Sequence, residues 1–330
     1  MSYPKPLSEK SLARLYAQSG LTQPQTDYLH GLFRACANLY GAIELRDMWL
    51  IHQGQKNAPS IRRKDLLAFS AIARREEAPY YVFEIDELYS EEKRTDLSRM
   101  VVHRDLIGTG YGRLARFYIL MEEAGQYGYY QPEDILAYVD PAPSAEELAL
   151  RARLNEIRVT AATCVPPYGD PYPCEHRGQK LGEFSFLTRG ERNEAEILAR
   201  NKAEYAAFLR WNEGTEAEKL FRNFRNAELY HNRNINRNIS RLFEELTEVG
   251  AELSMEETEE LLQLLMNYHN NTRVWCMCGW SPAEMMRMCP PSMPESISIG
   301  PNMKKMFESG ELNRNEFMEK IRKLGIKVIE

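Results

Sequence analysis

The apolar positions of the first part of the chain follow helical spacing in successive segments. In residues 27–40 the apolar side chains recur three or four positions apart, and Gly41 stands where such a helix would end. Residues 42–53 predict a second, short helix that buries its apolar residues around a turn. Residues 60–77 predict a third helix with Ser60 as the residue that caps its N-terminus.

Aromatic and β-branched residues at positions 79–90, PYYVFEIDELYS, then predict a short strand or hairpin. Three short helices followed by a strand pair is the layout of a winged helix, whose third helix commonly enters the DNA major groove. The third helix begins with Arg62, Arg63 and Lys64, which are candidate contacts to nucleic acid or to a partner. The alternative is that these cations only solvate an exposed helix, since Asp65 dilutes the patch. Many winged helices bind protein alone.

Residues 91–143 continue in a mainly helical pattern and act as a connector. The run RMVVHRDLIGTGYGRLARFYILMEEA is interpreted as helical on both sides of a glycine-rich break at residues 108–112. The spacing of these glycines matches neither a phosphate-binding loop nor a dinucleotide fingerprint. We therefore expect a flexible connection there rather than a phosphate site.

A new region begins near residue 144, where Ser144 and Glu147 form a capping box after a proline-rich stretch. Within it, residues 163–190 are rich in proline, glycine and tyrosine, which predicts an irregular excursion. Residues 191–248 predict two long helices with a break near residues 211–214.

The second of these helices carries an unusual set of arginine and asparagine side chains. Arg233, Arg237 and Arg241 are four residues apart and therefore share one helical face. Such a stripe would suit a nucleic-acid backbone. The alternative is pairing with the acidic helix that follows, whose glutamates lie at positions 256, 257, 259 and 260.

The acidic helix opens with a second capping box, Ser254 and Glu257, and leads into the segment NNTRVWCMCGWSPAEM at residues 270–285. Asn270 and Asn271 tolerate left-handed backbone and would end the helix. Ser281 followed by a proline predicts the start of the next helix. The segment therefore predicts a junction between helices that its two tryptophans pack.

The run LLQLLMNYHNNTRVWCMCGWSPAEM at residues 261–285 resembles a signature segment of uncharacterised bacterial helical proteins. In these proteins an Asn-Asn-Thr-Arg-x-Trp turn precedes a Gly-x-[Ser/Thr]-Pro-x-Glu helix start. Residues 27–90, with NLYGAIELRDMW and PYYVFEIDELY, are similar to the N-terminal part of the same family. The resemblance implies a helical protein and no particular activity. Some members carry an appended SEC-C zinc motif.

This chain departs from the SEC-C pattern, because ten residues separate Cys278 from Cys289 and a proline stands where a final ligand is needed. A looser zinc site made of Cys276, Cys278, Cys289 and His269 remains a hypothesis, since three thiols and an imidazole are a legitimate ligand set. The alternative is a packed turn in which reduced cysteine serves as a small apolar residue beside tryptophan.

Net charge, cysteine count and the lengths of apolar runs exclude several classes of protein. The chain has 330 residues, a formal net charge of −6 and six cysteines, too few for a disulfide scaffold. No apolar run reaches the length of a membrane span and the N-terminus lacks the apolar core of a secretory signal, so we expect a cytoplasmic protein. No catalytic motif is recognisable, and no catalytic or cofactor-binding residue is assigned.

These patterns predict a mainly α protein with minor β structure. A winged-helix-like domain would cover residues 1–90, a helical connector 91–143, a helical bundle 144–290, and a linker with a docking tail 291–330. The leading hypothesis is a non-catalytic binding protein that contacts protein or nucleic acid through its winged-helix-like region. The alternatives are a structural-zinc protein and an enzyme of unrecognised type, which leaves no local motif.

Overall fold

The computed structural model is mainly helical, as the sequence predicted. It describes residues 3–89, 95–108, 112–124, 127–166, 170–185, 212–230, 235–288, 296–298 and 327–329, with short pieces at 195, 197–199, 205, 208–209, 307, 309, 313–314 and 317–318. Two compact units are present, Met1–Ala283 and Glu284–Glu330. Among the described residues, no helix combines the length and the apolar composition that a membrane span requires.

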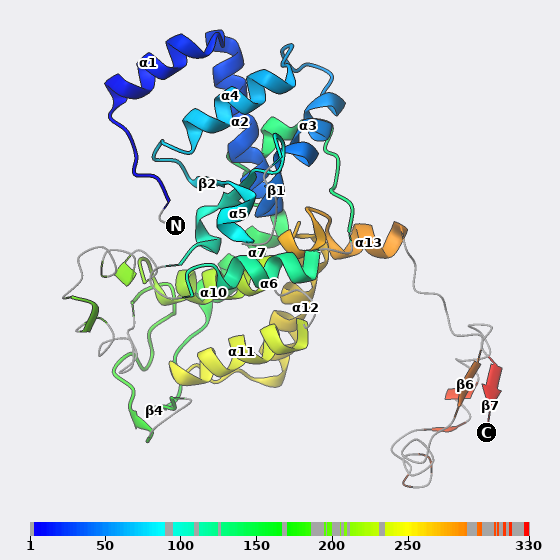
Figure 1. Cartoon of the computed structure of the whole chain (residues 1–330). Coiled ribbons are helices and arrows are strands. Elements are labelled where there is room, and N and C mark those ends of the chain that lie inside the picture. Colours follow the sequence, from blue (N-terminus) through cyan, green and yellow to red (C-terminus); the bar gives the residue numbers. More distant parts are fainter. Residues whose placement is uncertain are drawn as a thin grey trace. The chain divides into compact units, whose positions relative to one another are not determined.

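The N-terminal part of the first unit alternates helices with short strands (Figure 1). In chain order these are α1 Glu9–Ser19, α2 Gln23–Tyr40, β1 Ala42–Glu44, α3 Leu45–Gly54, α4 Arg63–Ala73, β2 Tyr80–Phe83, α5 Ile85–Leu88 and β3 Met100–His103. The strands form one antiparallel sheet in the order β1-β3-β2, with Val101 of β3 opposite Ile43 on one side and Val82 on the other.

This sheet changes two of the sequence interpretations. Ile43 lies in β1 and not in the second helix, and the run MVVH at 100–103 is the central strand where the sequence suggested helix. The boundary expected at residue 90 therefore falls between two paired strands of one sheet. A four-residue apolar strand carries no periodicity that separates it from a buried helix, so only its pairing reveals it.

Local capping signals explain where several helices begin and end. α2 starts with a capping box between Thr22 and Gln25 and ends at Gly41, which has a positive φ of 71°. α4 begins later than predicted, because Arg62 and not Ser60 precedes its first turn. The Asp65 carboxylate accepts the Arg62 backbone N–H at 2.9 Å and so satisfies one free donor of that helix start.

The remainder of the first unit adds helices and short irregular elements. These are η1 Arg104–Leu106, α6 Ala115–Ala124, η2 Ile135–Tyr138, α7 Ala145–Glu156, β4 Thr163–Cys164, β5 Tyr172–Pro173, α10 Glu216–Tyr230, α11 Ile235–Glu248, α12 Met255–Asn271, η4 Trp275–Met277 and α13 Pro282–Met288, the last of which crosses into the second unit. β4 and β5 form an antiparallel pair inside the segment predicted to be irregular. The capping residues Ser144 and Ser254 stand where the sequence predicted them.

The arginine- and asparagine-rich run at 217–246 contributes to two helices, α10 and α11, which pack against each other. In the second unit β6 Ser296–Ser298 pairs in parallel with β7 Lys327–Ile329.

Three clusters of buried residues hold the first unit together. The first lies among α2, α3 and α4, with Phe33 and Phe69 fully buried at its centre. The second fills the bundle of α7, α10, α11 and α12. The third joins β3, α5 and α6 to Leu229 of α10 and to Trp275 of η4. Because Trp275 comes from residues far beyond the sheet, the N-terminal fold is completed by a distant part of the chain.

Candidate functional site

The turn at residues 272–281 is a packing element. The indole of Trp275 donates its Nε1–H to the Asn38 carbonyl at 2.8 Å, and its ring lies against Gly41 and 4.9 Å from the His103 ring centre. The Trp280 indole donates to the Gly128 carbonyl at 2.9 Å. Both tryptophans thus bind helix ends and loops of the N-terminal part, as the sequence indicated for their packing role.

The helix before this turn ends without left-handed asparagine. α12 stops at Asn271, and Thr272 behind it has a φ of −82°. The left-handed residue is Cys278, with φ 50°, followed by Gly279 with φ 84°. The reversal of the chain therefore sits at the Cys-Gly step, and α13 starts at the predicted Ser281-Pro282.

The cysteines of the zinc hypothesis are enclosed in this turn. Cys276 and Cys278 are both buried, and the Cys278 thiol donates to the Ala124 carbonyl at 3.6 Å. Burial, and to a smaller extent the Asp47 carboxylate, raises the pKa of Cys278 to about 11. The thiol is therefore protonated at neutral pH, whereas a metal binds the thiolate.

Of the other two residues of the zinc hypothesis, one lies in the helical bundle and one lies outside the described residues. His269 is engaged with a carboxylate in the bundle, and Cys289 lies outside the described residues. Within the described part of the chain, no three histidine, cysteine or acidic side chains gather in a way that would hold a metal ion. The four-ligand zinc site stays a prediction.

His269 belongs to a buried hydrogen-bonded chain that joins three helices. Its Nδ1 lies 2.5 Å from the Glu228 carboxylate, and the other oxygen of Glu228 accepts the Asn238 amide at 2.6 Å. Glu228 is completely buried, and the other two are more than nine-tenths buried. A buried carboxylate is tolerable only when its charge is compensated in this way.

This arrangement resembles the orienting half of a general base, because a carboxylate at Nδ1 fixes the ring and its tautomer. A catalytic site also needs a nucleophile or substrate at Nε2, and no such group can be assigned. The chain Asn238-Glu228-His269 is therefore described as a structural link between α10, α11 and α12. No sequence pattern marked Glu228 or Asn238 as buried, because each lies among many other polar residues along the chain.

The predicted cations at the start of α4 are exposed but partly neutralised. The Arg62 guanidinium makes two hydrogen bonds to Asp65, at 2.9 and 3.0 Å. Arg63 stands over the Trp49 ring at 6.0 Å. Lys64 is exposed and makes no ion pair with any described residue.

Two further arginines of this region form ion pairs with carboxylates. Arg74 at the end of α4 bonds Glu84 at 3.1 Å and Glu87 at 2.8 Å. Arg99 bonds the same Glu84 at 2.8 Å. This partly buried network ties α4 to α5 and to the residue preceding β3, so its cations are not available to phosphate.

One arginine of the predicted stripe pairs within its own helix. Arg241 bonds Glu245 of its own helix at 3.0 Å, and Arg237 is exposed. Glu257 and Glu260 of the acidic helix bind Arg153 of α7 instead. Arg233 lies outside the described residues.

The cations of α4 and α11 also belong to different parts of the fold. α4 packs into the first core and α11 into the second. The two sets of cations are therefore carried by helices that pack into different cores.

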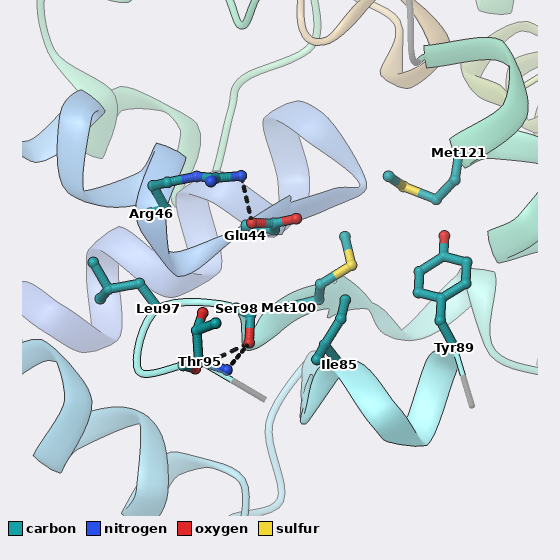
Figure 2. A pocket seen from close by; sticks show the side chains of 9 residues that line it. All are labelled: Glu44, Arg46, Ile85, Tyr89, Thr95, Leu97, Ser98, Met100 and Met121. Carbon is teal, nitrogen blue, oxygen red and sulfur yellow. Dashed lines mark hydrogen bonds and ion pairs between the residues drawn. The ribbon is translucent and has the colours of Figure 1, made fainter. Parts of the chain in front are cut away.

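A pocket of about 380 Å³ lies beside the sheet, next to α5. Figure 2 shows Met100 and Ile85 at its centre, Tyr89 and Met121 on one side, and the ion pair of Arg46 with Glu44 on another. Thr95, Leu97 and Ser98 complete the lining. The mixture of flexible thioethers with a polar rim suits an adaptable contact to an apolar group.

Comparisons with known proteins add no relative. No protein-family model matches the chain, and neither a curated protein nor a solved structure matches it.

Proposed function

We propose that residues 23–103 form a winged helix and that the protein is a non-catalytic, cytoplasmic binding protein acting on a protein partner through this region. The observation that carries the proposal is the order helix, strand, helix, helix, strand, one-turn helix, strand, with the sheet order β1-β3-β2. In a winged helix the third helix is the element presented to the partner, and here that helix is α4.

The outward side of α4 supports a contact role. Lys64 and Ala71 are exposed seven residues apart, so they share the face of α4 opposite the buried Leu66, Phe69 and Ala73. Arg75, also exposed, lies in the turn that follows the helix. We call Lys64, Ala71 and Arg75 the outer face of α4. A small residue between two cations lets another surface approach the helix closely.

The small number of unpaired cations in this region favours a protein partner over a nucleic-acid partner. Arg62, Arg74 and Arg99 are held by carboxylates, which leaves Arg63, Lys64 and Arg75 as cations without an ion pair among the described residues here. A strong DNA-binding protein makes roughly 6–10 phosphate contacts. Three cations on a chain of net charge −6 would give weak and strongly salt-dependent binding.

The first experiment tests nucleic acid directly. Fluorescence anisotropy of a labelled duplex is measured with the full chain at about 50 and about 200 mM salt. We expect no binding tighter than the roughly 10⁻⁴–10⁻⁶ M of non-specific association, and no effect of Lys64→Glu. Tight binding that Lys64→Glu weakens would overturn the protein-partner proposal.

The second experiment tests the protein contact. A photo-crosslinking amino acid replaces Ala71 on the outer face of α4 or, as a control, Met255, which is 78% exposed on α12. Irradiation in cells that make the protein should give a discrete protein adduct from position 71 alone. That adduct should disappear when Lys64 and Arg75 are both changed to glutamate. Adducts at both positions, or at neither, would contradict the proposal.

A further inference from the structure

A second pocket lies in the helical bundle and is lined by three arginines among its seven residues. It has a volume of about 410 Å³, within the range of small-molecule sites. Arg151 of α7 and Arg222 and Arg225 of α10 line it, together with Phe221, Gly214 and the two carboxylates Glu213 and Glu218. The pocket belongs to the second core and shares no residue with α4.

Arg225 is the cation of this pocket that lacks a partner. It is exposed and makes no hydrogen bond or ion pair with any residue in the described part of the chain. Its charge still reaches its neighbours. Burial lowers the pKa of His103 and raises that of Tyr268, and Arg225 adds to the first effect and opposes the second.

Arg151 is held in place with part of its hydrogen-bonding capacity unused. Its guanidinium stacks over the Phe221 ring at 4.3 Å and contacts Glu147 at 2.7 Å. Its Nε is buried and has no hydrogen-bond partner. A buried guanidinium N–H without an acceptor is unusual in a folded protein.

The aromatic side chain on which Arg151 stacks is held from a neighbouring helix. The Tyr268 ring of α12 packs edge-on against Phe221 at 5.6 Å. Phe221 therefore forms a fixed wall of the pocket, which Arg151 and Arg225 also line.

The two glutamates of the lining, Glu213 and Glu218, flank the start of α10. Glu218 accepts the Thr215 backbone N–H at 2.8 Å and thus caps the start of α10. Glu213 is exposed, and its backbone carbonyl accepts the Arg222 guanidinium at 2.6 Å. Glu213 is placed to accept hydrogen bonds from hydroxyl groups at the rim.

We propose that this pocket binds a small phosphate monoester, with the phosphate on Arg225, Arg151 and Arg222 and a hydroxyl-bearing remainder toward Glu213. Phosphate is favoured over a carboxylate because its tetrahedral oxygens accept hydrogen bonds from several guanidinium forks at once. The pocket exceeds the size of one phosphate ion, which leaves room for the organic part. The site is independent of the outer face of α4.

Binding is measured on the full chain by isothermal titration calorimetry with two probes, inorganic phosphate and glycerol 3-phosphate. Sodium chloride at matched ionic strength controls for screening. We expect both probes to bind and chloride to give no heat. We also expect glycerol 3-phosphate to bind more tightly than phosphate.

Variants assign the binding to this pocket. Arg225→Gln should weaken both probes by at least about tenfold, because it removes charge-assisted hydrogen bonds. Arg14→Gln, an exposed arginine on α1 with the same change of charge, should leave the affinities unchanged. Glu213→Gln should weaken glycerol 3-phosphate more than phosphate.

Two results would overturn the inference. One is equal affinity in the parent chain and in Arg225→Gln, provided that far-ultraviolet circular dichroism shows both to be folded. The other is absence of heat with both probes in the parent chain. Neither result bears on the partner contact of α4, which the crosslinking experiment tests separately.

Discussion

At several positions, the residue that fits is decided by a side chain from a distant part of the sequence. Gly41 shows this most directly. Its φ of 71° is one that side chains rarely adopt, and an added Cβ would lie 2.6 Å from the Trp275 ring. The sequence indicates a helix-ending glycine, whereas the contact to a residue more than two hundred positions away arises only in the folded chain.

Gly41→Ala is therefore expected to destabilise the fold by about 3 kcal/mol or more, from backbone strain plus overpacking against the indole. Gly20→Ala is the matched control, because Gly20 also ends a helix with positive φ but has nothing within 4 Å of the added Cβ. It should cost only about 1–2 kcal/mol. Urea unfolding of the three proteins measures the difference, and equal losses would show that the indole yields.

His52 couples stability to pH. Its ring is buried against Tyr28, whose hydroxyl lies 2.9 Å from Nδ1, and burial lowers the pKa of His52 below 6.5. The folded state therefore binds fewer protons than the unfolded state just below that pH. Stability from this group is full above pH 6.5 and declines as the pH falls toward the lower folded pKa.

We expect the unfolding free energy of the parent chain to fall between about pH 7 and pH 5, and His52→Gln to flatten that slope. His176→Gln is the control, since His176 is only half-buried, stacked on Phe184 and beside the Gln179 side chain at 3.0 Å. Urea titrations at several pH values give the two slopes. A slope that stays unchanged in His52→Gln would assign the effect to other groups.

At the scale of elements, polar side chains decide how helices start and how they join. The start of α4 depends on Asp65, which is almost fully buried and receives the Arg62 backbone and guanidinium. The Arg62 hydrogen bond holds the pKa of Asp65 below 3.8. Because the carboxylate is the stabilising form, its contribution is present above pH 3.8 and is lost as the pH falls through the lower folded pKa.

Asp65→Ala should cost about 1–2 kcal/mol at neutral pH, and the cost should shrink in acid. Asp27→Ala is the control, because Asp27 is exposed on α2 and contacts only the Gln23 amide among described residues. Its effect should stay within about 0.5 kcal/mol. A loss for Asp65→Ala that does not change with pH would contradict the role of the carboxylate charge.

The buried link Asn238-Glu228-His269 is the second case at this scale. His269→Leu leaves the fully buried Glu228 carboxylate short of one partner and should cost about 3 kcal/mol or more. Adding Glu228→Leu should recover part of that loss, since the stranded charge is removed. Unfolding free energies of the two single variants and the double variant form a cycle. Strict additivity would show that the two side chains do not depend on each other.

The whole molecule depends on contacts between the sequence-distant parts of its first unit. The sheet requires β3, and the third core requires Trp275 and Leu229. A fragment of residues 1–90 lacks all three, so it should show no cooperative thermal unfolding. A chain of residues 1–288 keeps them and should unfold cooperatively. Cooperative melting of the 1–90 fragment would show that the long-range contacts are dispensable.

The sequence by itself determined the helical class and many helix ends. Capping serines at 144 and 254, Gly41 and the Ser281-Pro282 step act within one helical turn, so a local pattern is enough to place them. The packing role of the two tryptophans followed from the same kind of signal.

Only the tertiary structure decided which charges are free and which are satisfied. In the sequence, Arg62 and Arg74 cannot be told apart from Lys64 as candidate surface cations. In the structure, carboxylates pair with both arginines. Glu228 is one of many glutamates, yet it is fully buried, and Arg225 is one of many arginines, yet no described residue pairs with it. Electrostatic pairing depends on distances of a few ångströms between residues far apart in sequence, and no periodicity encodes such distances.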